Sequence, residues 1–379
     1  MSALRKMLQV ALLITFMLMA SQCNIETQDI GHGLEADSAA NSDAARPRVA
    51  DTKRTPGNYG QDPVHSWQAI KPYSSAGETI GSIAENDSVF VAVSRRAILM
   101  STNGLEWHSD SCDWMSKVTW NGFSFFIFSS LFEPALVSPD GAKWQEHQTD
   151  LSENLWFVEW VGNSFAATGG GMHIQSVWFS LDGFKWRTTA AFCTGTIHSI
   201  IAADGGYLGV GGAVMWSKDG ADWSTVFDDS CISLQSIASN GEIYVAVGLR
   251  SEAVVSVDGS WARVPIPGGK EFRKIIWAGD RFVAVGGSFG GIAHIVSSPD
   301  GDTWRTEYCD TAGILLDVSC MEGTCVAVGE GGQLLVSPSV ELNSSTCTKK
   351  APSFSGGGFL FKPGGLLLSH ILSNAVPSP

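Results

Sequence analysis

The sequence predicts an all-β fold, a seven-bladed β-propeller with four antiparallel strands in each blade, and three observations support this prediction. A turn of the form Ser-x-Asp-Gly-x-x-Trp recurs about every forty residues. A short apolar strand precedes each copy of this turn. No segment between residues 64 and 347 has the 3.6-residue apolar period of an amphipathic helix. Repeats of this length, built from short strands and tight turns, are typical of propeller blades.

The repeated turn is clearest in SPDGAKW (138–144), SLDGFKW (180–186), SKDGADW (217–223) and SPDGDTW (298–304). Two further copies depart from it, because Asn103 replaces the aspartate in the first turn and Trp261 lies one residue early in the fifth. The six turn glycines are 37, 42, 37, 39 and 42 residues apart. The preceding strand, written FVAVG in its commonest form, occurs seven times, so we expect seven units.

The sixth unit illustrates the four strands expected in each blade. They are RKIIWA (273–278), RFVAVG (281–286), AHIVSS (293–298) and TWRTEY (303–308). Small side chains alternate with valine in VAVG, as expected where blades narrow toward the central axis. This pattern therefore favours a propeller over an open array of strands.

The two ends of the repeat region predict how the ring closes. The seventh unit (315–342) lacks both the Asp-Gly turn and the tryptophan, whereas HSWQAIKP (65–72) carries a tryptophan with no unit in front of it. We expect the strand around Trp67 to complete blade seven as its outermost strand. Such closure leaves no free sheet edge to recruit other chains.

We assign the repeated turn a structural role. The aspartate can accept hydrogen bonds from backbone N–H groups two and three residues further on, and the glycine can supply a positive φ. The tryptophan can cover neighbouring sheets and bury a large apolar area. The structural residues are Trp67, Asn103, Trp107, Asp140, Trp144, Asp182, Trp186, Asp219, Trp223, Asp258, Trp261, Asp300 and Trp304.

The turn resembles the Asp box, the bacterial neuraminidase repeat, which also occurs in propellers without sialidase activity. It lacks the residue that usually separates Asp from Gly in sialidases, and is similar to the shortened boxes of propellers related to photosystem II assembly factors and of exported bacterial repeat proteins. The resemblance implies a propeller whose boxes lie away from the functional face. The Arg-Ile-Pro element of sialidases has no counterpart, because ARPRVA (45–50) lies outside the repeats and does not match.

The amino-terminal region is typical of an exported protein. Arg5 and Lys6 precede an apolar run at 7–20, which predicts a signal peptide over residues 1–22. A lipid anchor at Cys23 and an uncleaved signal anchor are the alternatives. We expect a flexible stalk at 23–63, the propeller at 64–347 and a disordered tail at 348–379. The location is then secreted, periplasmic or at the cell surface.

Charge excludes one class of partner. The formal net charge is −14, and removal of Arg5 and Lys6 with the signal peptide would make it −16. A protein this acidic repels phosphate backbones, so we expect no nucleic-acid partner. We expect a monomer with no transmembrane segment in the mature chain.

Eight cysteines in an exported chain suggest disulfides. Cys320 and Cys325 flank a short turn and could bridge it, and Cys193 and Cys231 could join successive blades. The alternative is a cation or thiolate site, because aspartates accompany the cysteines that follow the box tryptophans. Calcium is the cofactor that such a site would suit, and we expect no other.

We expect function in the loops that follow the tryptophan strands and the VAVG strands, which open on one face. The candidate ligand-binding residues are Asp110, Asp113, Trp114, Asp228, Asp229 and Asp310. The irregular loops at 129–137 and 169–180 add Phe132 and Trp178 as candidate stacking residues. The main hypothesis is a noncatalytic exported propeller that binds a protein or an extracellular glycan. A glycoside-active enzyme and an assembly factor for an envelope complex are the alternatives.

Overall fold

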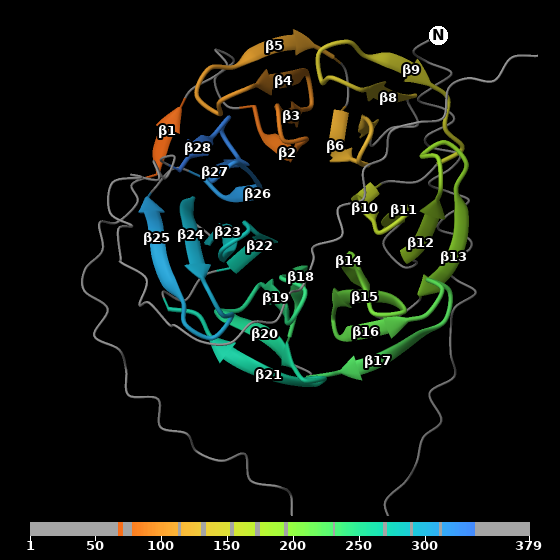
Figure 1. The fold of residues 1–379 in the computed structure, drawn as a ribbon, viewed down its shortest axis with the longest axis vertical. Helices are drawn as coiled ribbons and strands as arrows, with labels where there is room; N and C mark the ends of the chain where they lie inside the picture. The colour runs from red at the N-terminus through yellow and green to blue at the C-terminus, as the bar shows by residue number, and fades with distance from the viewer. Residues whose placement is uncertain are drawn as a thin grey trace, which may run out of the picture. The chain divides into compact units, whose positions relative to one another are not determined.

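The computed structural model describes residues 67–70, 78–112, 115–129, 134–151, 155–170, 175–192, 196–229, 232–267, 271–288, 291–310 and 313–337. These residues form seven antiparallel four-stranded sheets and include no helix. The sheets stand around a common axis as the blades of a propeller (Figure 1). The predicted fold class is therefore confirmed.

Blades one to six run outward from the axis in chain order, whereas blade seven ends on β1 (Gln68–Ile70). The innermost strands are β2 (Ile80–Glu85), β6 (Met115–Trp120), β10 (Leu155–Val161), β14 (Ile197–Ala203), β18 (Leu234–Ser239), β22 (Glu271–Trp277) and β26 (Leu315–Met321). The second strands are β3 (Phe90–Ser94), β7 (Phe125–Ser129), β11 (Ser164–Gly170), β15 (Gly206–Gly211), β19 (Tyr244–Gly248), β23 (Phe282–Ser288) and β27 (Thr324–Gly329).

The third strands are β4 (Ala97–Ser101), β8 (Ala135–Ser138), β12 (Gln175–Ser180), β16 (Val214–Ser217), β20 (Glu252–Val257), β24 (Ile292–Ser298) and β28 (Leu334–Val336). The outermost strands are β5 (His108–Ser111), β9 (Gln145–His147), β13 (Arg187–Phe192), β17 (Trp223–Phe227), β21 (Ser260–Pro265), β25 (Arg305–Asp310) and β1 (Gln68–Ile70). In each blade the innermost strand therefore follows the outermost strand of the blade before it.

The strand directions give the ring two different faces. Because neighbouring strands are antiparallel, the first-to-second and third-to-fourth turns of every blade lie on one face, which we call the turn face. The second-to-third turns and the connections between blades lie on the opposite face, where the innermost strands begin. We call this the mouth face.

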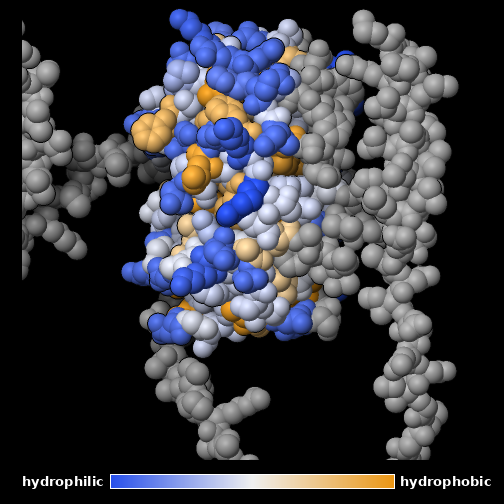
Figure 2. Space-filling model, turned by 90° about the vertical axis from the view of Figure 1, so that its right-hand side faces the viewer, coloured by the Kyte–Doolittle hydropathy of each residue, from blue (hydrophilic) through white to orange (hydrophobic). Residues whose placement is uncertain are grey.

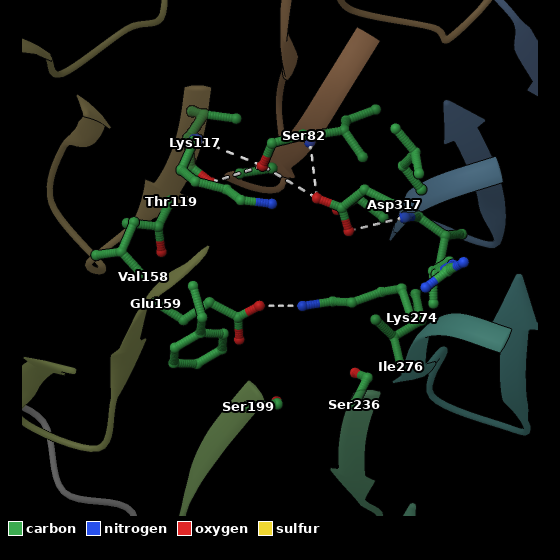
Figure 3. A pocket seen from close by; sticks show the side chains of 18 of the residues that line it. Ser82, Lys117, Thr119, Val158, Glu159, Ser199, Ser236, Lys274, Ile276 and Asp317 are labelled. Carbon is green, nitrogen blue, oxygen red and sulfur yellow. Dashed lines mark hydrogen bonds and ion pairs between the residues drawn. The ribbon is translucent and has the colours of Figure 1, made fainter. Parts of the chain in front are cut away.

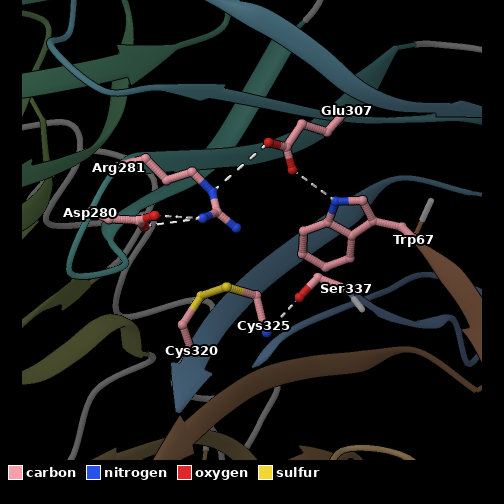
Figure 4. Close-up of a disulfide and its surroundings, with 7 residues drawn as sticks. All are labelled: Trp67, Asp280, Arg281, Glu307, Cys320, Cys325 and Ser337. Carbon is pink, nitrogen blue, oxygen red and sulfur yellow. Dashed lines mark hydrogen bonds and ion pairs between the residues drawn. A yellow bond between two sulfur atoms is a disulfide. The ribbon is translucent and has the colours of Figure 1, made fainter. Parts of the chain in front are cut away.

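Blade seven is assembled from both ends of the propeller. β1 pairs with β28 in antiparallel register, with Gln68 opposite Val336 and Ile70 opposite Leu334. Trp67, directly before β1, is buried against residues of blade six such as Val283. Its indole Nε1 donates a hydrogen bond of 3.1 Å to Glu307 Oε2 of β25 (Figure 4). The predicted closure by the strand around Trp67 is confirmed.

The repeated turn is a compact hydrogen-bonded unit. In the second blade, Asp140 Oδ1 accepts hydrogen bonds from the backbone N–H groups of Ala142 at 2.9 Å and Lys143 at 3.0 Å. Ser138 Oγ accepts a hydrogen bond of 2.8 Å from the N–H of Gly141. The indole of Trp144 donates to the carbonyl of the same glycine at 3.1 Å. The turns at 101–107, 180–186, 217–223 and 298–304 repeat this pattern.

The turn glycine also contacts the preceding blade. Gly141 has a φ of +74°, and a Cβ added to it would lie 2.8 Å from Val91 Cγ2 of blade one. Trp144 packs in the same interface with Val89 and Val91. Trp107, Trp186, Trp223 and Trp304 pack in the corresponding interfaces. The turn therefore joins neighbouring blades, as its expected structural role requires.

The fifth turn corrects one expectation. Val257 pairs with Ser260, so only Asp258 and Gly259 connect β20 to β21. Both residues have positive φ values, 52° and 77°, which is the conformation of a two-residue type I′ hairpin. The loop is too short for the hydrogen-bond pattern of the other turns. Asp258 therefore forms the hairpin backbone and does not accept backbone hydrogen bonds as Asp140 does. Trp261 still packs at the interface with blade four.

The outer wall of the ring is mixed in polarity. On the side drawn in Figure 2, hydrophilic residues surround small groups of hydrophobic ones. The outermost strand β5 is exposed along its whole length, whereas the second strand β3 is buried throughout. The core therefore lies between the blades.

None of the described residues forms a helix that is long and apolar enough to cross a membrane.

A disulfide joins Cys320 to Cys325, which are paired directly across β26 and β27 (Figure 4). This confirms one of the two disulfides considered from the sequence. Cys193 and Cys231, the other candidate pair, lie outside the described residues. Cys309 is exposed and forms no disulfide within the described part of the chain.

Candidate functional site

Every innermost strand contains a register shift at the same place, near the mouth face. In β6 the shift lies between Met115 and Lys117, and in β26 it lies between Leu315 and Asp317. The same shift occurs in the other five blades. It aligns seven equivalent residues, which we call the inner positions: Ser82, Lys117, Phe157, Ser199, Ser236, Lys274 and Asp317.

Three inner positions carry a hydrogen-bond acceptor that joins one blade to the next. Ser82 Oγ accepts from the N–H of Val118 at 3.3 Å, and Ser236 Oγ accepts from the N–H of Ile275 at 3.2 Å. Asp317 Oδ2 makes the same contact to the N–H of Ile83 at 3.0 Å. These acceptors satisfy buried backbone donors where the blades converge, so they are structural.

Lysine replaces the acceptor at the inner positions of blades two and six. An ammonium group only donates hydrogen bonds, so Lys117 and Lys274 cannot make the contact that serine makes. Lys274 instead forms an ion pair with Glu159 of blade three, across the central channel (Figure 3). Burial acts to lower the pKa of Lys274, but attraction to Glu159 and then to Asp317 outweighs it, so the pKa is raised. This pair closes part of the channel.

Lys117 is the lysine without such a partner. No carboxylate of the described residues lies within 4.0 Å of its ammonium nitrogen. Asp317 already accepts hydrogen bonds from Ser82 Oγ and Ile83 N at 3.0 Å and from Val318 N at 2.9 Å. Burial, opposed by attraction to Asp317, lowers the pKa of Lys117. The amine of Lys117 therefore lacks the close carboxylate partner that Lys274 has.

These side chains line a cavity of about 350 Å³ on the propeller axis. At its mouth-face end the cavity is bordered by Trp156, His198 and Arg273, each at the register shift of its own strand. The side chain of Trp156 is 39% exposed. Burial, followed by repulsion from Arg273, lowers the pKa of His198. The mouth thus presents an aromatic surface and a cation beside a charged channel.

A second cavity, of about 550 Å³, lies on the turn face beside blade seven, where the repeated turn is missing. Its walls are formed by Gln68, Thr102, Asn103, Leu105, Met321, Glu322, Thr324, Val336 and Ser337. Glu322 is the one ionisable residue among them. The cavity lacks the converging charged groups of the channel, which we therefore take as the candidate site.

The site residues expected from the sequence lie elsewhere on the mouth face. Asp110 and Asp310 are exposed near the ends of outermost strands, and Asp229 forms an ion pair of 2.6 Å with Arg263. Asp228 follows β17, while Asp113 and Trp114 lie outside the described residues. The described aspartates belong to three blades, with Asp110 in blade one, Asp228 and Asp229 after blade four, and Asp310 in blade six. Among the described residues no group of three or more His, Cys, Asp or Glu side chains could hold a metal ion.

Trp178, a candidate stacking residue for which the sequence also allowed buried packing, is buried. Only 6% of it is accessible, because it packs with Phe128 and Leu155 in the interface between blades two and three. Phe132 lies outside the described residues. Sequence reasoning missed Lys117, Glu159 and Lys274. A charged residue inside an otherwise apolar innermost strand, as in MSKVTW (115–120), was the signal that could have found them.

Comparisons with known proteins support the fold. No protein-family model and no curated protein sequence matches the chain. Among solved structures, YCF48 bound to D1 peptide is similar with a TM-score of 0.55 and 16% identity, over 72% of this chain and 96% of that chain. Virginiamycin B lyase from Staphylococcus aureus is similar with a TM-score of 0.58 and 10% identity, over 72% and 99%. The propeller domain of Doa1 has a TM-score of 0.53 and 12% identity, over 73% and 98%. At these identities the similarity shows the seven-bladed propeller fold.

Proposed function

We propose that the protein is a protein-binding propeller that holds a peptide segment of its partner across the mouth face. The observation that carries this proposal is the half-exposed Trp156, which shares the rim of the channel with Arg273. Tryptophan and arginine are enriched among the residues that contribute most to protein–protein affinity. His198 on the same rim adds a further polar contact.

The comparisons support this use of the fold. YCF48 is a similar propeller that has been solved with D1 peptide bound. A role in the assembly of an envelope complex would be a special case of the same function. The resemblance of the repeated turn to a shortened Asp box agrees with this proposal, because it assigns the turn face to structure and leaves the mouth face for binding.

We also propose that the protein is exported. The sequence of residues 1–22 has the layout of a signal peptide. The Cys320–Cys325 disulfide suits an oxidising compartment. Fractionation of cells that express the full chain tests this. Recovery of the processed protein outside the cytoplasm is expected, and an unprocessed cytoplasmic protein would contradict export.

A glycoside-active enzyme is the alternative, since three carboxylates, Glu85, Glu159 and Asp317, line the channel. Glycoside hydrolysis needs one carboxyl group that can donate a proton to the leaving group. Glu159 is instead paired with Lys274, and Asp317 accepts three hydrogen bonds from the protein. Glu159 and Asp317 are therefore engaged in holding the channel together. Burial raises the pKa of Glu85, so Glu85 is the carboxyl group that hydrolysis would have to use as the proton donor.

Selection from a random-peptide display library tests the proposed function. Selected peptides should bind the full chain with an affinity that falls at least tenfold in Trp156→Ala, the loss expected when a central aromatic contact is removed. Phe123→Ser is the matched control, because Phe123 is 82% exposed at the β6–β7 turn on the turn face. Loss in the control but not in Trp156→Ala would contradict the proposal. Turnover of chromogenic glycosides, abolished by Glu85→Gln, would favour the enzyme instead.

A further inference from the structure

We propose that the channel is a carboxylate-binding site and that the Lys117 ammonium group is its anchor. The inference rests on the proposed function for the direction of approach, since a ligand group reaches Lys117 from the mouth face. It adds the chemical class of that group: the terminal carboxylate of a peptide, an acidic side chain, or a small free carboxylic acid.

Lys117 stands at an inner position but cannot make the contact that three other inner positions make. The inner positions of blades one, five and seven each bond the backbone of the next blade. Lys117 does not make that contact. Lys274 does not make it either, but forms an ion pair with Glu159. Lys117 gains no equivalent partner in the described part of the chain, so its presence is not explained by the stability of the ring.

The hydrogen-bonding groups inside the cavity leave the amine of Lys117 available. Lys274 is paired with Glu159, and the two oxygens of Asp317 already accept hydrogen bonds from three donors. In its protonated form the amine of Lys117 can therefore donate hydrogen bonds to a ligand. A carboxylate would form a charge-assisted hydrogen bond with it, which is stronger than a bond between neutral groups.

The charges that line the cavity select the type of anion. A carboxylate carries one negative charge, which matches the single ammonium group that is available. A phosphate monoester carries close to two charges and would lie near Glu159 and Asp317, which line the same cavity. Repulsion from these acids disfavours a dianion. The cavity volume of about 350 Å³ suits one small group rather than a folded element.

Binding should be linked to protonation of Lys117. The charged or titratable side chains that face the channel are Glu85 on β2, Glu159 on β10, His198 on β14, Arg273 and Lys274 on β22, and Asp317 on β26. In the free protein, burial lowers the pKa of Lys117. A bound carboxylate favours the charged form, so it should raise this pKa again.

The test follows the amine of Lys117 by NMR after reductive ¹³C-methylation of lysines, in the full chain with its disulfide intact. The probes are acetate, a short peptide with a free carboxyl terminus, and the same peptide with an amidated terminus. Lys117→Met identifies the resonance and removes the anchor. Lys185→Met is the control, because Lys185 is exposed in the third repeated turn.

We expect acetate or the peptide acid to shift the Lys117 resonance and raise its pKa, and Lys117→Met to weaken binding about tenfold or more, as for a hydrogen bond to a charged group. Tighter binding of the peptide acid than of acetate identifies a chain terminus as the source, and the reverse identifies a free acid. The inference is overturned if neither acid shifts the resonance, or if the acid and the amide bind alike.

The carboxylate site and the proposed protein-binding function can each fail without the other. If display-selected peptides depend on Trp156 but bind Lys117→Met as tightly as the unaltered protein, the mouth face binds protein and the carboxylate site is wrong. If acetate binds at Lys117 but no selected peptide depends on Trp156, the carboxylate site stands and the protein-binding function is wrong.

Discussion

Trp67 and Glu307, 240 residues apart in the chain, are joined by a hydrogen bond of 3.1 Å from the indole nitrogen to Oε2 of the carboxylate. Ser297 Oγ and Arg305 Nη2 donate to the other oxygen, Oε1, at 2.6 and 3.1 Å. Glu307 is almost completely buried, so each of these donors compensates for lost hydration. The contact ties the first described residue of the propeller to blade six and holds the ring closed.

Removing this closure should destabilise the whole protein. We expect Trp67→Ala to lower the free energy of unfolding by about 3–5 kcal/mol, the usual loss for a large buried aromatic residue. Trp67→Phe keeps much of the packing but leaves Glu307 one donor short, and should lose about 1–3 kcal/mol. Urea unfolding measures both. Trp156→Ala is the control and should change little. Deletion of residues 60–72 should abolish the folded monomer, and a stable monomer after that deletion would refute the closure.

The repeated turns should contribute to acid unfolding. Hydrogen bonds from the backbone N–H groups of Lys143 and Ala142 lower the pKa of Asp140, and corresponding bonds lower that of Asp219. For Asp182 and Asp300, burial opposes the same bonds and is outweighed. Each folded-state pKa is below the ordinary value of 3.8. This contribution to stability is therefore complete above that value and is lost as the pH falls through the folded pKa.

Replacing the four aspartates by asparagine should remove this acid-sensitive contribution. The first turn already shows that an amide can take the position, since Asn103 Oδ1 accepts from the N–H groups of Leu105 and Glu106 at 2.9 Å. We expect the free energy of unfolding to change little at neutral pH and the acid-unfolding midpoint to move to lower pH. Fluorescence of the turn tryptophans measures the unfolding. The matched alanine variants should be destabilised at every pH. An unchanged midpoint would show that other groups govern acid unfolding.

Lys117 should reduce stability at neutral pH. Its pKa is lower in the folded than in the unfolded chain, where the ordinary value is 10.5. The unfolded chain therefore binds the proton more tightly, and this effect increases stability as the pH rises toward 10.5. Lys117→Met should be more stable than the unaltered protein at neutral pH, by about 1.4 kcal/mol for each pH unit that separates the folded and unfolded pKa values. The difference should shrink in alkali. Lys143→Met, an exposed control, should show no such dependence.

The disulfide should have a smaller effect than the closure of the ring. Cys320 and Cys325 are only five residues apart, and the loop between them is already a hairpin turn. The chain-entropy argument gives about 2 kcal/mol for so short a loop. The double variant Cys320→Ala/Cys325→Ala should remain folded and lose at most this amount in urea. Loss of folding would mean that the bond is needed to assemble blade seven.

The propeller fold could be predicted from the sequence because its turns have local sequence signatures. The spacing of the turn glycines predicted the blades, and the orphan Trp67 predicted the closing strand. Asp258 was misjudged because one residue fewer in the turn changes the backbone conformation. Trp178 could be placed either in a loop or in the core from the sequence, and the structure has it in a strand between two blades.

The channel could be predicted only in part. Lys117 and Lys274 disrupt apolar strands and could have been identified by aligning the innermost strands on their repeat. The pairing of Glu159 with Lys274 joins blades three and six, so it depends on the closed ring rather than on any local pattern. The same holds for Trp156, whose exposure follows from the register shift at the start of β10.

The central claim is that the mouth face, and not the turn face, binds the partner. A photo-reactive aromatic amino acid, which keeps an aromatic side chain at position 156 on the mouth face, tests it directly with a display-selected peptide as the probe. The same amino acid at position 181 on the turn face is the comparison. Leu181 is 79% exposed, so both positions are accessible to a ligand. We predict cross-linking of the peptide from position 156 and none from position 181. Cross-linking from position 181 alone would contradict the account.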